Sequence, residues 1–259
     1  MGIRSLFLAC VLWLLAAACW AQQETLNVVL SNQEYPPYLG EELPDYGLLS
    51  KVVTEAFRLE NVNVTYAWYP NNRTLQSART GAVDGSLGWA ITPDRQKDLL
   101  YTDPVMSLRM VFFQRVDKKI LWSAMRDLAP YRIGVTAGNT YSEDFMRLQQ
   151  TGVLHTQEVG DDVLNMRKLL AKHIDLFPID AEVGAMLVAR TFSVDQRKLL
   201  IAQPRPFWIA PLHVVIWKKQ PHAAELVQRF NLGLAALHRS GEFDRLIIQT
   251  RRRIYAGSL

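Results

Sequence analysis

Segments typical of β-strands and of α-helices alternate along this chain, and the alternation begins twice. Short apolar runs are followed by stretches in which apolar residues recur at helical spacing. Strands are expected at residues 25–30, 62–68, 83–87, 131–136, 155–159, 176–179 and 212–217, and helices at 47–59, 73–79, 141–150, 161–171, 181–191 and 223–238. Helices between successive strands favour parallel pairing, so the pattern predicts an α/β protein with a largely parallel sheet. Because the pattern restarts near residue 131, it also predicts two lobes of like architecture.

The chain opens with a segment that is typical of secretion. Residues 5–18 form an apolar run behind a short basic start, and this run is too short to cross a membrane comfortably. We therefore predict a signal peptide over residues 1–21, cleavage after Ala21 and an exported, periplasmic protein. The alternative is a lipid attached to Cys19, although Ala16 stands where lipid-modified signals usually carry Leu.

Cysteine usage and charge exclude several classes of protein. Both cysteines, Cys10 and Cys19, lie in the predicted signal, so the mature chain must rely on its apolar core without disulfides. The formal net charge is +4, and the basic residues are scattered apart from those at 251–253. This distribution gives no face for nucleic acid. Nucleophile motifs and metal-ligand spacings are missing from the sequence, so we expect no metal, no cofactor and no catalytic residue.

Ligands of open α/β sheets bind beyond the carboxyl ends of strands. After the first predicted strand, Tyr35 stands beside two prolines, which favours either an aromatic binding surface or a packed turn. After the strand at 176–179, Asp180 opens a helix, where it is either a ligand-binding acid, an N-cap or both. The segment at 138–140, which ends in Thr140, precedes another helix and resembles the start of an anion-binding helix.

The segment GWAITPDR, residues 88–95, follows the strand at 83–87 and combines groups that suit a small anion. Arg95 can hold a carboxylate through two parallel hydrogen bonds. Thr92 would add a hydroxyl and Ala90 a backbone N–H. The alternative is a surface turn, in which Arg95 pairs with a neighbouring Asp and contributes little.

Five motifs occur in the same order as in a known family. They are EYPPY, then GAVDG with ITPDR and YTDPV, then IGVTAGNTY, then HIDLFPID, and finally LHRSGEFDRL. Together they resemble the family 3 periplasmic solute-binding proteins, the polar amino-acid receptors of ABC importers, over nearly the whole mature chain.

The resemblance implies a two-lobed periplasmic binding protein fold of type II, with two crossover strands acting as a hinge. It places lobe one at residues 22–108 and 210–259, and lobe two at 109–209. The crossings are expected near residues 107–110 and 205–212.

The same resemblance assigns roles to four side chains. Arg95 matches the arginine that binds the ligand carboxylate, and Asp180 matches the acid that binds the ligand ammonium. Tyr35 matches the aromatic residue that covers the ligand side chain, and Thr140 the hydroxyl of lobe two. We therefore expect a small-molecule ligand, an amino acid or a related carboxylate.

Two departures from the family pattern bear on the ligand. Trp89 stands where lysine- and histidine-binding members carry a serine, so an indole replaces a hydroxyl at the predicted pocket. Arg73, in the turn YPNNR, resembles a branch whose ligands the family pattern does not determine. Arg73 is therefore a further candidate for ligand binding.

Three functions remain open at this stage. The first is a monomeric receptor that delivers a ligand to an inner-membrane ABC permease. The second is an enzyme on the same fold, because periplasmic cyclohexadienyl dehydratase resembles these receptors throughout. Such an enzyme needs an acid in the cleft, for which Glu182 and Asp180 are candidates, and Arg73 and Arg95 would hold a dicarboxylate substrate. The third is a receptor that presents its ligand-bound state to a membrane sensor.

Overall fold

The computed structural model describes residues 25–256. The predicted signal peptide at 1–21, its cleavage after Ala21 and the alternative lipid on Cys19 all lie outside this range. Across the described range, no helix is both long enough and apolar enough to span a bilayer.

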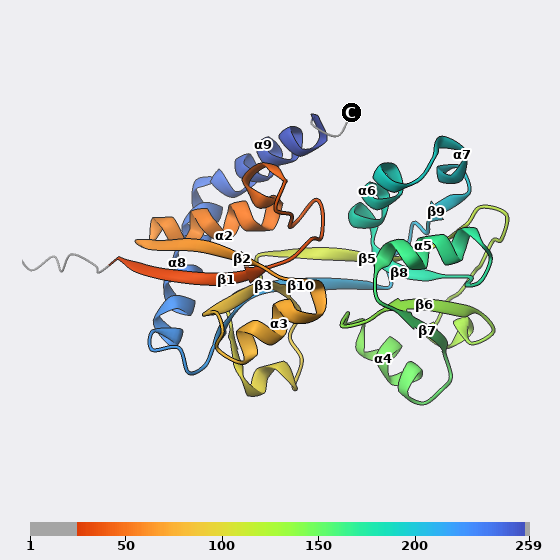
Figure 1. The fold of residues 1–259 in the computed structure, drawn as a ribbon, viewed down its shortest axis with the longest axis horizontal. Helices are drawn as coiled ribbons and strands as arrows, with labels where there is room; N and C mark the ends of the chain where they lie inside the picture. Colours follow the sequence, from red (N-terminus) through yellow and green to blue (C-terminus); the bar gives the residue numbers. More distant parts are fainter. Residues whose placement is uncertain (1–24, 257–259) are drawn as a thin grey trace, which may run out of the picture.

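The first half of the molecule is a sheet with helices on both faces (Figure 1). Its central strand, β1 (Leu26–Asn32), pairs in parallel with β2 (Val62–Trp68) on one side and β3 (Gly85–Trp89) on the other. The helices α2 (Leu48–Leu59) and α3 (Asn71–Arg79) connect these strands. All five elements were predicted from the sequence, and β3 begins slightly later than expected.

Two long strands run from this half into the other and join them (Figure 1). They are β5 (Met106–Arg115) and β10 (Trp208–Trp217), which pair antiparallel with each other. Towards its end β10 also pairs with β3 and with the short strand β4 (Leu99–Tyr101). The prediction of two crossing strands is therefore confirmed.

The second half is built on the far end of β5. There β8 (Phe177–Asp180) and β9 (Leu200–Ala202) pair antiparallel with β5, while β6 (Arg132–Thr136) and β7 (His155–Val159) form a parallel pair. Its helices are α4 (Glu143–Gln150), α5 (Asp162–Leu170), α6 (Ala181–Thr191) and α7 (Val194–Arg197). Short 3-10 turns lie at η1 (Pro44–Tyr46) and η2 (Arg95–Lys97) in the first half, and at η3 (Met125–Leu128) in the second half.

The expectation of a largely parallel sheet is wrong for the crossing region. Among the strands of residues 25–256, only the ladders β1–β2, β1–β3 and β6–β7 are parallel. The chain leaves the first half along β5 and returns along β10, so these strands must run in opposite directions. The periodicity of the sequence locates strands, but it does not report their direction.

The helix α8 (Ala223–Ser240) brings the chain back onto the first half. Its Phe230 packs against Phe57 of α2, with ring centroids 5.0 Å apart and both side chains fully buried. The helices touch where Gly233 faces the backbone of Ala56, because a Cβ on Gly233 would lie 1.9 Å from the Ala56 carbonyl oxygen. A glycine is therefore required at this crossing.

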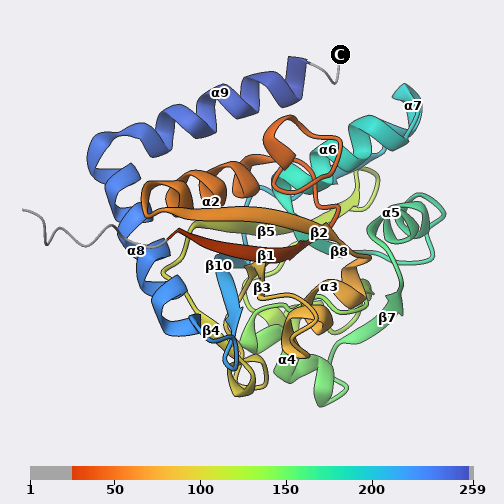
Figure 2. The ribbon, with the colours of Figure 1, turned by 60° about the vertical axis from the view of Figure 1, so that its left-hand side comes forward.

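The last helix, α9 (Glu242–Ala256), follows the left-handed Gly241 and lies along α2 (Figure 2). Its C-terminal end reaches towards α6 of the second half (Figure 2). Elements from both ends of the described chain thus build the first half, and the segment between β5 and β10 builds the second.

Candidate functional site

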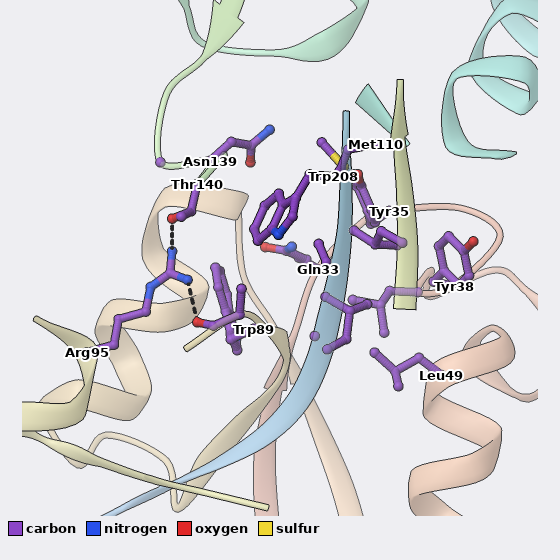
Figure 3. A pocket seen from close by; sticks show the side chains of 17 residues that line it. Gln33, Tyr35, Tyr38, Leu49, Trp89, Arg95, Met110, Asn139, Thr140 and Trp208 are labelled. Carbon is purple, nitrogen blue, oxygen red and sulfur yellow. Dashed lines mark hydrogen bonds between the residues drawn. The ribbon is translucent and has the colours of Figure 1, made fainter. Parts of the chain in front are cut away.

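A cavity lies where the two halves meet, beside the crossing strands (Figure 3). We call it the interlobe cavity, and its free space is about 650 Å³, including the part open to solvent. The residues that line it are Gln33, Tyr35, Tyr38, Leu39, Leu49, Gly88, Trp89, Ala90, Arg95, Leu108, Met110, Gly138, Asn139, Thr140, Trp208, Ala210 and Leu212.

Arg95 is held rigidly at one wall of this cavity. Its backbone N–H donates to the hydroxyl of Thr92 at 3.3 Å, where the turn η2 begins, and the side chain is only 7% exposed. The guanidinium donates to the carbonyl of Ala90 at 3.0 Å and to the hydroxyl of Thr140 at 2.9 Å (Figure 3). It also lies over the ring of Trp89, 5.0 Å from the centroid. Burial lowers the pKa of Arg95, but an arginine stays protonated at neutral pH.

Arg95 forms no salt bridge with any carboxylate of residues 25–256. Asp94 and Asp98, the partners expected for a surface turn, instead bind Arg79 of α3 at 2.8 and 2.7 Å. The alternative of a surface ion pair at Arg95 is therefore wrong. A buried cation without a carboxylate partner lines the cavity, and such a group suits an anionic ligand.

Four aromatic residues contribute to the remaining wall, namely Tyr35, Tyr38, Trp89 and Trp208. The indole N–H of Trp89 donates to the hydroxyl of Ser86 at 2.7 Å, which fixes the plane of that ring. Tyr35 and Tyr38 stack with centroids 6.4 Å apart. Burial, reinforced by acidic neighbours that include Asp180, raises the pKa of both phenols, so both are neutral at physiological pH.

Asp180 ends β8 and caps the N-terminus of α6. One carboxylate oxygen accepts from the backbone N–H groups of Glu182 and Val183 at 2.9 and 3.0 Å, and the other accepts from the N–H of Arg109 at 2.8 Å. The side chain is 1% exposed and is not among the residues that line the cavity. Burial raises the pKa of Asp180 in spite of these hydrogen bonds.

Glu182, two residues further along α6, links the two halves outside the cavity. It accepts from the hydroxyl of Tyr255 at 3.0 Å and more weakly from that of Tyr38 at 3.4 Å, and it pairs with Arg251 at 3.2 Å. Glu182 belongs to the second half, whereas its three partners belong to the first. We call this cluster the Glu182 bridge. Together with the Arg95–Thr140 hydrogen bond, it holds the halves against each other.

Comparison with family models decides the affiliation of the chain. The model of the bacterial extracellular solute-binding proteins, family 3, matches residues 28–249. The chain belongs to this family. The family and the two-lobed fold predicted from the sequence are therefore confirmed, and the protein is a solute-binding protein by family.

Solved structures share the fold of this solute-binding protein at low identity. A histidine kinase sensor domain with similarity to periplasmic binding proteins is 17% identical, with a TM-score of 0.70 over 88% of this chain and 96% of that one. An amino acid ABC transporter substrate-binding protein from Streptococcus pneumoniae, bound to L-arginine, is 17% identical, with a TM-score of 0.69 over 88% of this chain and 95% of that one. An arginine transport system periplasmic binding protein from Legionella pneumophila is 18% identical, with a TM-score of 0.68 over 87% and 99%. A search of curated proteins gave no match.

The structure brings five of the predicted ligand-binding residues to the interlobe cavity of this solute-binding protein: Tyr35, Trp89, Ala90, Arg95 and Thr140. Ala90 contributes its carbonyl group, which accepts from Arg95, whereas the sequence pointed to its N–H.

The other three predicted residues do not line the cavity. Thr92 lies behind Arg95 and positions its backbone. Arg73 is exposed on α3, and Asp180 caps α6. Their proposed contacts with a ligand remain predictions.

Gln33 and Trp208 are polar or aromatic lining residues that were not among the predicted ligand-binding residues. Gln33 lies just beyond the end of β1, and Trp208 opens the crossing strand β10. Each stands at a position that the expected architecture marks as close to the ligand: the carboxyl end of a strand and the start of a crossing. Position alone could have identified them, because neither residue belongs to a motif.

Proposed function

We propose that this protein is a periplasmic receptor that captures a small amino-acid-like or carboxylate ligand between its two lobes for an ABC importer. The single observation that carries the proposal is Arg95, a buried guanidinium that faces an aromatic cavity and has no carboxylate partner within residues 25–256. Similar structures include an amino acid ABC transporter substrate-binding protein and an arginine transport system periplasmic binding protein, which supports the same class of ligand.

The two lobes correspond in this proposal to residues 22–108 with 210–259, and to 109–209. Arg95 on lobe one and Thr140 on lobe two face the same cavity. A carboxylate that bound Arg95 would therefore also meet lobe two, and ligand binding would favour the closed arrangement of the lobes.

Calorimetric titration of the protein tests this function, after a thermal-shift screen of amino acids and small carboxylates has found a ligand. A ligand at a hundredfold its Kd stabilises the folded protein by about 2.7 kcal/mol, so the screen is sensitive. Arg95→Ala should weaken binding by about 2–5 kcal/mol, because the ligand carboxylate would be buried without its partner. Arg245→Ala is the matched control, since Arg245 is a largely exposed arginine of α9. Equal affinities of Arg95→Ala and the parent would end the proposal.

Binding without catalysis is part of the proposal. The dehydratase alternative needs an acid in the cleft, and both candidates have other contacts. Asp180 binds three backbone N–H groups, and Glu182, which is not a lining residue, binds Arg251, Tyr255 and, more weakly, Tyr38. Product formation on incubation with prephenate or arogenate would contradict a purely receptor function.

A sensor partner is a second candidate, favoured by the similarity to a histidine kinase sensor domain. The two candidates differ in the membrane protein that recognises the closed form. Ligand-dependent stimulation of ATP hydrolysis by a reconstituted permease supports the importer, and ligand-dependent autophosphorylation of a kinase supports the sensor.

A further inference from the structure

The lining of the interlobe cavity carries one kind of charge. Arg95 is its cation, and no Asp or Glu occurs among the lining residues within the described part of the chain. Asp180, the acid expected to receive a ligand ammonium, already accepts three backbone N–H groups and lies outside the lining. A ligand ammonium in this cavity would therefore be buried without a carboxylate and near a fixed positive charge, and both conditions are unfavourable.

The backbone oxygen of Ala90 does not supply the missing acceptor beside Arg95. The carbonyl oxygen of Ala90 accepts from Arg95 at 3.0 Å and from the hydroxyl of Tyr101 at 3.4 Å. A carbonyl oxygen has two lone pairs, so these two donors leave it no lone pair for a ligand ammonium.

Gln33 offers a neutral polar group instead. Its side chain is 9% exposed, and its Oε1 has no hydrogen-bond partner among residues 25–256. Figure 3 shows its amide beside Trp208, pointing towards the side of the cavity where Trp89 and Arg95 lie. Buried polar atoms are nearly always hydrogen-bonded, so an unpartnered amide oxygen at a binding cavity marks a position for a hydrogen-bond donor of the ligand.

Apart from the polar side chains of Asn139 and Thr140, the rest of the lining is apolar or aromatic. Trp89 and Trp208 bring two indole rings, and Leu49, Leu108 and Met110 add aliphatic surface. Such walls gain free energy from an apolar ligand body, roughly in proportion to the area that leaves water.

We infer that the ligand is a monocarboxylate with an apolar body and an uncharged polar group, such as a hydroxyl, in place of an amino acid's ammonium. Its carboxylate binds Arg95, its uncharged group binds the amide of Gln33, and its body packs between the indoles. The inference rests on the proposed receptor function and names the class of ligand for that same cavity. On this inference, the cavity binds the monocarboxylate in preference to the zwitterion.

Matched pairs of ligands test this selection by calorimetry on the mature chain. Each pair shares one side chain and differs at one group: L-phenylalanine against 3-phenyllactate, L-leucine against 2-hydroxy-4-methylpentanoate, and L-tryptophan against indole-3-lactate. We expect the hydroxy acid to bind at least about tenfold more tightly in the best pair. 3-Phenylpropionate, which lacks the hydroxyl, should bind about fivefold more weakly than 3-phenyllactate, because it loses one hydrogen bond.

Variants of Gln33 separate its role from general packing. Gln33→Leu should weaken the binding of 3-phenyllactate and leave the binding of 3-phenylpropionate nearly unchanged. A packing defect would instead weaken the binding of both ligands. Gln33→Glu introduces the missing carboxylate, and it should shift the preference of each pair towards the amino acid.

The outcomes distinguish a failure of the inferred ligand class from a failure of the proposed receptor function. If the amino acids bind as tightly as their hydroxy counterparts, the inference is overturned and the receptor function stands. If no member of either series binds, the receptor function for small carboxylates fails, and the inference fails with it.

Discussion

Replacing Glu182 by Gln measures how strongly the Glu182 bridge holds the closed arrangement. The substitution keeps the size of the side chain and one acceptor oxygen, but it removes the charge that pairs with Arg251. That pair is 3.2 Å long, and Arg251 is 46% exposed, so its contribution is that of a surface ion pair, about 0.2–1 kcal/mol. The hydroxyl of Tyr255, at 3.0 Å, adds a hydrogen bond to a charged acceptor that weakens when the charge is lost.

The two effects together give an expected loss of about 1 kcal/mol from the closed state. The contact with Tyr38 is long, at 3.4 Å, and adds little. A loss of this size lowers the ratio of closed to open molecules by about fivefold. Since ligand affinity falls with the fraction of binding-competent molecules, the apparent Kd of any ligand should rise by up to the same factor.

Small-angle X-ray scattering and calorimetry provide the assay. The Glu182→Gln variant should have a larger radius of gyration than the parent without ligand, and the same radius with saturating ligand. Glu143→Gln, an exposed acid on α4, is the matched control. A double-mutant cycle with Arg251→Ala should give a coupling energy of about 0.2–1 kcal/mol. A coupling of zero, together with unchanged scattering, would refute the view that this bridge stabilises closure.

Three further predictions concern stability and the site. Burial raises the pKa of Asp175, but hydrogen bonds from Arg132 and Lys118 outweigh it and hold the pKa at about 2. The stabilisation is therefore fully present above the unfolded pKa of about 4 and is lost as the pH falls towards 2. Asp175→Asn should cost about 1–2 kcal/mol in urea unfolding at neutral pH, with a smaller difference in acid. A pH-independent difference would contradict this account. Gly233→Ala should destabilise the fold by about 1–3 kcal/mol through the clash with α2, whereas Gly160→Ala, whose Cβ would meet open space, should change the melting temperature little. Arg73→Ala should leave the ligand Kd within about twofold by calorimetry, because Arg73 is exposed outside the cavity; a large loss would place it in the site.

Sequence reasoning predicted those features of the fold that depend on local periodicity and on ordered motifs. The amphipathic helices of the first half lie where the spacing of apolar residues placed them. The position of Arg95 at a strand end was predictable for the same reason, because the strand at 83–87 and the motif that follows it are both local.

The partners of side chains were not predictable, because they depend on contacts between distant segments. Asp94 and Asp98 turn away from Arg95 because Arg79, on a preceding helix, binds them both. Gln33 and Trp208 both line the cavity, although much of the first half and almost the whole second half separate them along the chain. The local sequence around either residue does not predict that the two lie close together.

The path of the chain through β5 and β10 has a consequence for how the protein is made. β10 lies between β3 and β5 in the sheet, and α8 covers the face of α2. The first half therefore lacks the strand that pairs with β3 and β4, and a covering helix, until the last part of the chain has been synthesised. At about 5–20 residues per second, the segment between β3 and β10 takes on the order of ten seconds to emerge from the ribosome. We expect the early strands to stay incompletely folded during that interval, because β10 and α8 have not yet been made. We expect folding to be a single late event that the C-terminal helices trigger, and a chain truncated before α8 to remain sensitive to protease.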